Sequence, residues 1–315
     1  QELDARVETI FSTMTVADRV GQLFIVTFQG NDTSFESEIT ELIYGYRIGG
    51  VVLSPESGNF TNEAGADTPR SVATLANQLQ AIAYGILLPP DQALQPVPNQ
   101  PWPPGNLVSL EREIGVTPPN IPLLIGVQQA GDNLPGTSLR RGFTPLPSQL
   151  AIGSTWSPEN ASGIGSIVGR ELSAVGINLL LGPSLNLVDQ PRADAVGSLG
   201  AFYFGGNPYW VGRIARAYIT GVHQGSGGRL ATIAGNFPGQ GDVDRLPDEE
   251  VATIQRNAAE LQQVTLPPFL AVTRSSRELG ADPSLTDGLM TSHMRFGAIQ
   301  AADGRNTPLS LDPEL

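Results

Sequence analysis

Short apolar runs recur along the chain and alternate with longer segments whose apolar residues have helical spacing. Strands that are covered on both faces of a parallel sheet have near-continuous apolar runs of this kind. We therefore predict six buried strands, at residues 22–28, 49–54, 122–128, 177–188, 230–236 and 288–294. The helical spacing and the capping residues predict helices at residues 3–14, 34–46, 69–86, 159–175, 209–223 and 248–264.

Repeated strand–helix units imply a parallel sheet with right-handed crossovers, arranged as a barrel or as a doubly wound sheet. No G-x-G-x-x-G follows any of the six runs, so a dinucleotide-binding sheet would lack its phosphate-binding turn. The pattern favours an α/β fold, a (β/α)8-type TIM barrel that is incomplete, with about six strands before Leu315. We expect residues 1–315 to form one such domain.

A proline-rich segment interrupts the alternation. Seven prolines lie between Pro89 and Pro104, and such a run forms neither a helix nor a central strand. We expect an insertion loop at about residues 88–107. Trp102, which stands among these prolines, offers a docking element for another protein subunit.

The composition excludes several kinds of chemistry. The net charge is −13 and every basic residue is arginine, so nucleic acid and anionic membranes are not expected partners. With no cysteine and only His223 and His293, thiolate chemistry and a multi-histidine metal site are excluded, and we expect no cofactor. No apolar run is long enough to span a bilayer. The start at Gln1, as after removal of a secretory signal, favours an extracytoplasmic location.

Motifs in six parts of the chain occur in a fixed order. They are Met14-Thr-Val-Ala-Asp-Arg-Val-Gly-Gln-Leu-Phe24, Gly49-Gly-Val-Val-Leu53, Ile121-Pro-Leu-Leu-Ile-Gly-Val127, Arg170-Glu-Leu-Ser-Ala-Val-Gly-Ile-Asn178 with Gly182-Pro-Ser-Leu-Asn186, Phe237-Pro-Gly-Gln-Gly241 and Leu289-Met-Thr-Ser-His293. Together they resemble glycoside hydrolase family 3, on the side of its bacterial β-N-acetylglucosaminidases. The resemblance covers nearly the whole chain and implies a retaining glycosidase barrel, in which an aspartate attacks the anomeric carbon and a second group protonates the leaving oxygen.

The chain departs from the family at the positions that would hold and cleave a sugar. The family's D-x-E-G-G after the third strand reads Gln128-Gln-Ala130-Gly-Asp132, and its aspartate at the end of the fourth strand is Asn186. Phe202 replaces the arginine that grips the sugar, and Gly235-Asn236 replaces the lysine–histidine pair. These replacements remove ionisable groups from the pocket.

The family's catalytic machinery is matched only in part by this chain. The loop after the fifth strand lacks the family's histidine, and Asp242 and Asp244 are the candidate proton donors; a solvated acidic loop is the alternative. His293 matches a family histidine, with either a catalytic role or a hydrogen-bonded place at the barrel rim. No strand with the nucleophile's motif, G-[LV]-[IV]-x-[ST]-D, occurs before Leu315.

Two side-chain groups outside these motifs are also candidates. His223 falls at the end of a predicted helix, where an imidazolium would compensate the helix dipole. The aromatic residues between 202 and 210 offer a sugar-stacking platform, or else part of the core and part of a surface for a partner.

Two main functions remain open from the sequence, beside a barrel that binds small molecules in an altered pocket. The first is a catalytically degenerate family 3 barrel that acts as an extracytoplasmic structural or binding subunit, with other protein subunits or carbohydrate as partners. The second is a divergent but active β-glycosidase or β-N-acetylhexosaminidase, with its nucleophile beyond residue 315 and its proton donor in the acidic loop.

Overall fold

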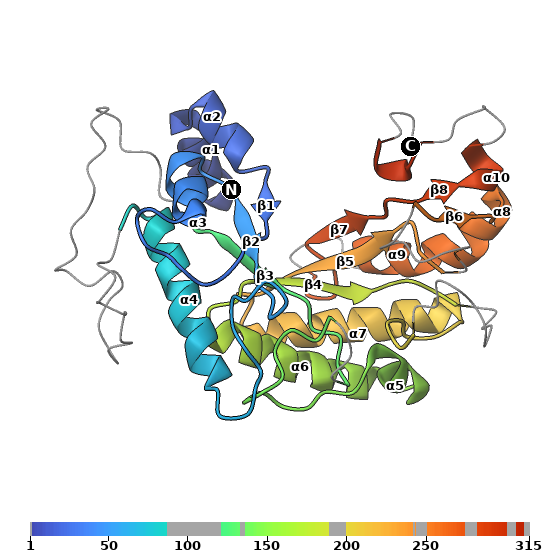
Figure 1. The fold of residues 1–315 in the computed structure, drawn as a ribbon. Helices are drawn as coiled ribbons and strands as arrows, with labels where there is room; N and C mark the ends of the chain where they lie inside the picture. The colour runs from blue at the N-terminus through green and yellow to red at the C-terminus, as the bar shows by residue number, and fades with distance from the viewer. Residues whose placement is uncertain are drawn as a thin grey trace. The chain divides into compact units, whose positions relative to one another are not determined.

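The computed structural model describes residues 2–86, 121–132, 136–188, 200–241, 243, 251–274, 282–300 and 307–311. The chain forms two compact units (Figure 1). The first unit comprises Gln1–Val127, Arg141–Phe143 and Ala174–Asn178, and the second comprises Gln128–Arg140, Thr144–Ser173 and Leu179–Leu315. The insertion loop expected at about 88–107 lies outside the described residues, so the single-domain organisation with that loop stays a prediction.

Among its described residues, the first unit has a parallel sheet of β1 (Ile25–Val26), β2 (Gly50–Val52) and β3 (Leu124–Val127). Each lies inside a predicted run but is shorter than that run. Val51, Ile125 and Val127 are fully buried, as a strand covered on both faces requires.

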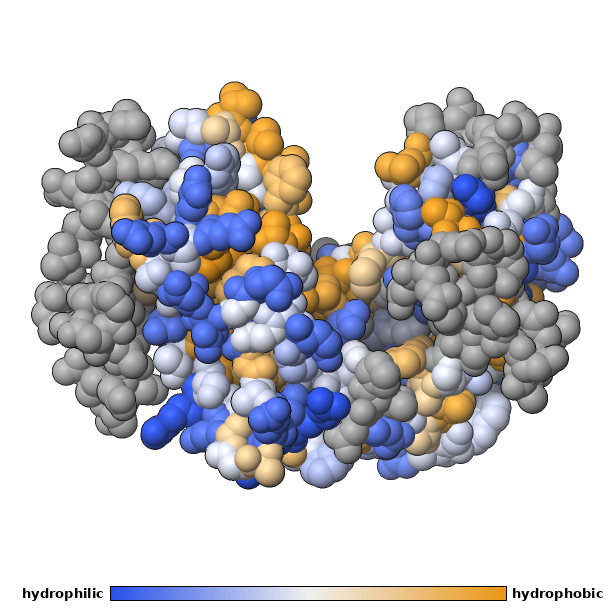
Figure 2. All heavy atoms as spheres, viewed as in Figure 1, coloured by the Kyte–Doolittle hydropathy of each residue, from blue (hydrophilic) through white to orange (hydrophobic). Residues whose placement is uncertain are grey.

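In the described part of this unit, the helices are α1 (Glu2–Thr13), α2 (Val16–Gly21), α3 (Glu38–Thr40) and α4 (Thr68–Ala83). Helix α3 continues as a π-helical turn over Glu41–Gly45. Thr15 caps α2 in a capping box with Asp18. Exposed apolar residues gather over α1, α2 and β1 (Figure 2).

The second unit has a parallel sheet of β4 (Leu179–Ser184), β5 (Ala231–Phe237) and β7 (Gly288–Thr291). The main helices of this unit are α5 (Gln149–Ser154), α6 (Pro158–Ala174), α7 (Pro208–Ser226) and α9 (Leu266–Thr273). In both units the strands follow one another in chain order and alternate with helices. This is the arrangement of an incomplete (β/α) barrel.

Helices α6 and α7 lie side by side in Figure 1 and touch through their backbones. A Cβ atom on Gly165 would meet the carbonyl oxygen of Tyr218, and one on Gly169 would meet that of Val222. On α7, Gly221 and Gly225 would meet the backbone of α6 in the same way. Only glycine allows two helix backbones to come so close.

The last part of the second unit differs from the predicted pattern. Residues 248–264 were predicted as one helix, and this prediction is wrong, because Thr253–Ile254 form strand β6 and the helical segment begins later. It runs through α8 (Ala258–Glu260), a π-helical turn over Leu261–Thr265 and then α9. Strand β6 pairs with β8 (Arg295–Phe296), which is followed by α10 (Gly297–Gln300) and a 3-10 turn at Leu309–Leu311. A small core of Val243, Ala252, Ile254, Met294 and Phe296 holds this region together.

No helix in the described residues is long and apolar enough to cross a bilayer.

Candidate functional site

Carboxamide side chains meet where β4 and β5 end. Asn186 follows β4 and is 2% exposed. Its Oδ1 accepts a hydrogen bond from the backbone N–H of Gln240 at 2.8 Å, and a longer one from that of Asn236 at 3.4 Å. Its Nδ2 donates to Asn236 Oδ1 at 3.4 Å and to Gln240 Oε1 at 3.5 Å. Where the family has an aspartate, this chain therefore has Asn186, and both the amide nitrogen and the amide oxygen of its side chain have hydrogen-bond partners. We call Asn186, Asn236 and Gln240 the amide cluster.

A further buried amide supports the same end of β4. Gln149, the first residue of α5, donates from Nε2 to the carbonyl oxygen of Ser184 and accepts from the Ser184 backbone N–H, at 3.1 and 3.2 Å. The sequence reasoning did not identify Gln149 or Gln240. Gln240 lies within the quoted Phe237-Pro-Gly-Gln-Gly241 motif, so the motif itself was the available signal.

Three of the substituted positions converge beside Gly136. A Cβ atom built on that glycine would lie 3.2 Å from Gln128 Oε1, 3.6 Å from Phe202 Cε1 and 3.9 Å from the Cβ of Ala130. The structure thus brings together three of the positions at which the chain departs from the family. An amide, a methyl group and an aromatic ring stand there, and none of them carries a charge.

Asp132 is the one carboxylate described among the family pocket positions, and it supports a helix. Its Oδ2 accepts a hydrogen bond from the backbone N–H of Ser148 at 2.8 Å. Ser148 in turn caps α5. The hydrogen bonds from Ser148 hold the pKa of the exposed Asp132 carboxyl below its usual range. This carboxylate is therefore ionised at neutral pH and positions the start of α5.

Of the remaining predicted site residues, the structure describes Gly235 and His293. Gly235 lies in β5, and a Cβ atom there would lie 3.3 Å from the Cβ and Cε of Met290, so a longer side chain would displace that methionine. His293 is exposed, and its Nδ1 lies 2.6 Å from the hydroxyl of Ser310. Asp242 and Asp244 lie outside the described residues. Within the described part of the chain, no group of three or more histidine, aspartate or glutamate side chains could hold a metal ion.

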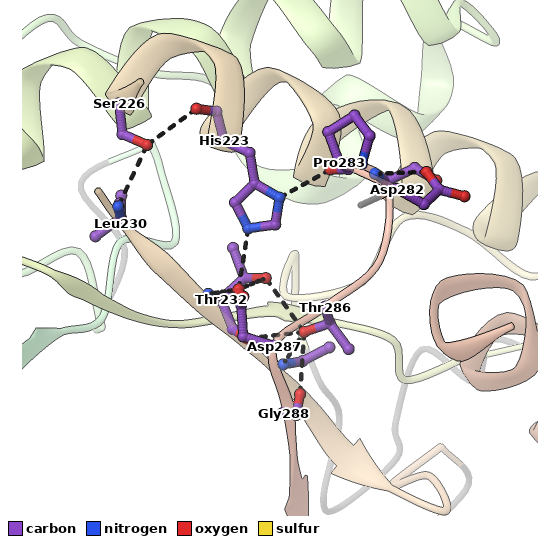
Figure 3. Close-up of polar contacts among 11 residues, drawn as sticks. His223, Ser226, Leu230, Thr232, Asp282, Pro283, Thr286, Asp287 and Gly288 are labelled. Atoms are coloured by element: carbon purple, nitrogen blue, oxygen red, sulfur yellow. Dashed lines mark hydrogen bonds and ion pairs between the residues drawn. The ribbon is translucent and has the colours of Figure 1, made fainter. Parts of the chain in front are cut away.

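A separate polar network surrounds His223, in the last turn of α7 (Figure 3). Its Nδ1 lies 2.8 Å from the carbonyl oxygen of Pro283 and its Nε2 lies 3.0 Å from Asp287 Oδ2. Both partners are acceptors, so both bonds form only when the imidazole is protonated. The helix-end position is as predicted, but the partners are residues 60 or more positions away, which the sequence could not reveal.

The pKa values of this pair are shifted in opposite directions. Burial lowers the pKa of His223, but the hydrogen bonds to Asp287 and Pro283 and the Asp287 charge outweigh it, so the pKa is raised. Burial raises the pKa of Asp287, and the hydrogen bonds from His223 and Thr232 reverse this, so its pKa is lowered. Thr232 lies near the start of β5 and Asp287 just before β7, so the network lies at the opposite strand ends from the amide cluster.

Comparisons with known proteins identify a family for this chain. Residues 107–315 match the model of the glycosyl hydrolase family 3 N terminal domain. A beta-hexosaminidase of Pseudomonas aeruginosa is 31% identical over 175 residues, which are 55% of this chain and 47% of the relative. The chain thus spans about half the length of this relative.

Solved structures show the same fold. A family 3 beta-N-acetylglucosaminidase from Paenibacillus sp. superimposes with a TM-score of 0.69 at 26% identity, covering 94% of this chain and 44% of that one. The beta-N-acetylhexosaminidase of Beutenbergia cavernae gives a TM-score of 0.63 at 24% identity, covering 90% and 69%. The barrel-type alternation, the family model and these relatives together show that the chain belongs to glycosyl hydrolase family 3 and carries its N-terminal domain.

Proposed function

We propose that this chain is a non-hydrolysing family 3 barrel that acts as a structural or binding subunit and retains contact with carbohydrate. The observation that carries the proposal is the amide cluster. At the family's aspartate position, Asn186 is buried and its carboxamide is engaged by Asn236 and Gln240. An uncharged carboxamide whose donor and acceptor sides already have partners is not available to hold a sugar as the family's aspartate would.

The chemistry of retaining hydrolysis sets the standard for this comparison. It needs two groups about 5 Å apart, one of which attacks the sugar while the other protonates the leaving oxygen. Loss of a single transition-state hydrogen-bond donor commonly lowers the rate by about 10²–10³. Here several of the family's polar contacts are lost at once, because the chain has Gln128, Ala130, Phe202 and the amide cluster at those positions. Packing does not compensate for such losses.

The second candidate is an active β-N-acetylhexosaminidase, and the names of the relatives favour it. It requires a nucleophile supplied by a part of the protein outside residues 1–315. It also requires a proton donor, for which Asp242 and Asp244 are the candidates. Both requirements can be tested on the full-length gene product.

The deciding experiment is hydrolysis of 4-nitrophenyl N-acetyl-β-glucosaminide by the full-length gene product, beside the Pseudomonas aeruginosa relative as a positive control. We expect release of nitrophenol no faster than with heat-inactivated protein. Turnover above that level that is abolished by D242N/D244N would establish the second candidate and overturn the first.

A further inference from the structure

Three aromatic rings and one guanidinium group form an exposed cluster on the second unit. The rings of Trp156 and Trp210 pack edge to face with their centroids 5.4 Å apart, and those of Tyr209 and Trp210 do so at 5.7 Å. The guanidinium of Arg213 lies 5.4 Å from the centroid of Trp210, and its Nη1 donates to the hydroxyl of Tyr209 at 3.2 Å. We call these four residues the aromatic rim.

Trp156 occupies a place that does not favour tryptophan. It follows the C-cap of α5, and its φ of 52° lies in the left-handed region, where glycine is the usual residue. The side chain is also 57% exposed, so burial recovers little of this backbone cost. Neither the conformation nor the exposure favours folding, and strained positions of this kind cluster at ligand-binding sites.

The size of the exposed aromatic surface favours a small ligand. Trp156 is 57% and Tyr209 63% exposed. Because large aromatic side chains have about 150–250 Å² of surface each, the two together offer about 250 Å². A stable protein interface needs about 800 Å² on each partner. Among the described residues of this unit, the other exposed large apolar side chains are Leu270, Leu289 and Leu311, and of these only Leu311 is as exposed as the two aromatic residues.

Exposed polar residues lie close to the aromatic rim along the chain. They are Ser154, Thr155, Glu159, Asn160 and Asn207. The charges of Glu159 and Arg213 interact, so an acceptor and a donor stand near the same rings. Flat apolar faces bordered by hydrogen-bonding groups match a pyranose ring, which has apolar C–H faces and hydroxyl groups at its edge.

The aromatic rim lies on the side of the unit where barrels bind ligands. Gln149 at the start of α5 is bonded to Ser184 at the carboxyl end of β4, and α7 begins at Pro208. In Figure 1, α5 and the beginning of α7 lie at the end toward which the arrow of β4 points. The carboxyl ends of the strands form the ligand-binding face of (β/α) barrels.

We propose that the aromatic rim is an oligosaccharide-binding surface, separate from the amide cluster, on which sugar rings stack against Trp156 and Tyr209. Arg213 and Glu159 take hydroxyl groups at the ring edges. This proposal rests on the proposed function in one respect, the retained contact with carbohydrate, and is independent of whether the protein hydrolyses sugars.

The test is calorimetric titration of the full chain with the β-1,4-linked tetramer of N-acetylglucosamine. We expect W156A and Y209A each to weaken binding by about tenfold, the loss typical of an aromatic anchor. Tyr46 is 62% exposed in the first unit. The matched control Y46A should bind like the unchanged chain.

A second variant separates binding from folding. Glycine is the residue that the backbone of Trp156 favours, so W156G should melt no lower than the unchanged chain and still lose affinity for the tetramer. If the unchanged chain does not bind the tetramer, the proposal that the aromatic rim binds oligosaccharide is overturned. Full affinity in W156G would overturn it too, and is the result expected if the rings bind a protein partner instead. The nitrophenol assay is unaffected by either outcome and decides the catalytic question separately.

Discussion

The close approach of α6 and α7 gives a sharp prediction, because two glycines on α6 differ only in what faces them. A Cβ atom on Gly165 would lie 3.1 Å from both the carbonyl carbon of Tyr218 and the backbone nitrogen of Val222, and closer still to the Tyr218 oxygen. A Cβ atom on Gly163 would have nothing within 4 Å. Alanine should therefore have opposite effects at the two positions.

The magnitudes follow from packing and helix propensity. Overpacking costs about 1–3 kcal/mol, and the upper end applies at Gly165 because a backbone carbonyl cannot rotate away. Alanine in place of helical glycine returns about 0.5–1 kcal/mol. We expect G165A to lose about 2 kcal/mol of unfolding free energy and G163A to gain about 0.5–1 kcal/mol.

Thermal melts of the two variants measure this difference. Tryptophan fluorescence is a suitable signal because Trp156 and Trp210 both lie in the second unit. At about 2–4 °C per kcal/mol, G165A should melt about 4–8 °C below the unchanged chain and G163A about 2 °C above it. Equal melting temperatures for the two variants would show that α6 and α7 are not in backbone contact.

Two further substitutions test the polar networks. H223Q should lower stability by about 1 kcal/mol, a small value because Asp287 is half exposed. Because folding raises the pKa of His223, the stability that His223 contributes is fully present below its unfolded pKa and is lost as the pH rises through its folded pKa. Because folding lowers the pKa of Asp287, the stability that Asp287 contributes is lost as the pH falls through its folded pKa. The difference in melting temperature between H223Q and the unchanged chain should thus be largest between about pH 4 and pH 6.5, and a difference that does not vary from pH 5 to pH 9 would contradict the ion pair. N186A removes the acceptor of the Gln240 N–H, so its free energy of unfolding in urea should fall by about 1–3 kcal/mol. The control N160A, at an exposed position, should stay within about 0.5 kcal/mol of the unchanged chain. Equal losses in the two variants would mean that the amide cluster contributes nothing to stability.

The strand content of the barrel could be predicted from sequence because its cause is local. Residues such as Val51, Ile125 and Leu180 are buried, and continuous apolar runs indicate strands covered on both faces. The lengths could not be predicted. Strand β1 contains only Ile25 and Val26, because hydrogen bonding to a neighbour sets where a ladder stops, and neighbours are not visible in a run of apolar residues.

The errors near residue 250 have a specific cause. Pro247 and the acidic residues after it matched the signals of a helix start. The structure instead starts the helix after Asn257, which forms a capping box with Glu260. The spacing Asn257-Ala-Ala-Glu260 was visible in the sequence and is the stronger signal, because it satisfies two backbone N–H groups reciprocally. Helix α5 was not predicted either, although its N-cap residue, Ser148, is a typical one.

The resemblance alone was enough to expect that Gln128, Ala130 and Phe202 lie close together. It could not show which hydrogen bonds Asn186 makes. Asparagine has nearly the shape of aspartate, so Asn186 keeps the packing at the end of β4 while it removes the charge. Its Nδ2 lies 3.4 Å from Asn236 Oδ1 and 3.5 Å from Gln240 Oε1. Both partners are carboxamides, which can turn to present an NH2 group, so an aspartate at position 186 would also find hydrogen-bond donors. Because Gln128, Ala130 and Phe202 would still stand in place of the family's polar groups, an Asn186→Asp variant should show no hydrolysis of the nitrophenyl substrate, and any turnover gained by this one change would mean that the rest of the catalytic site is still in place.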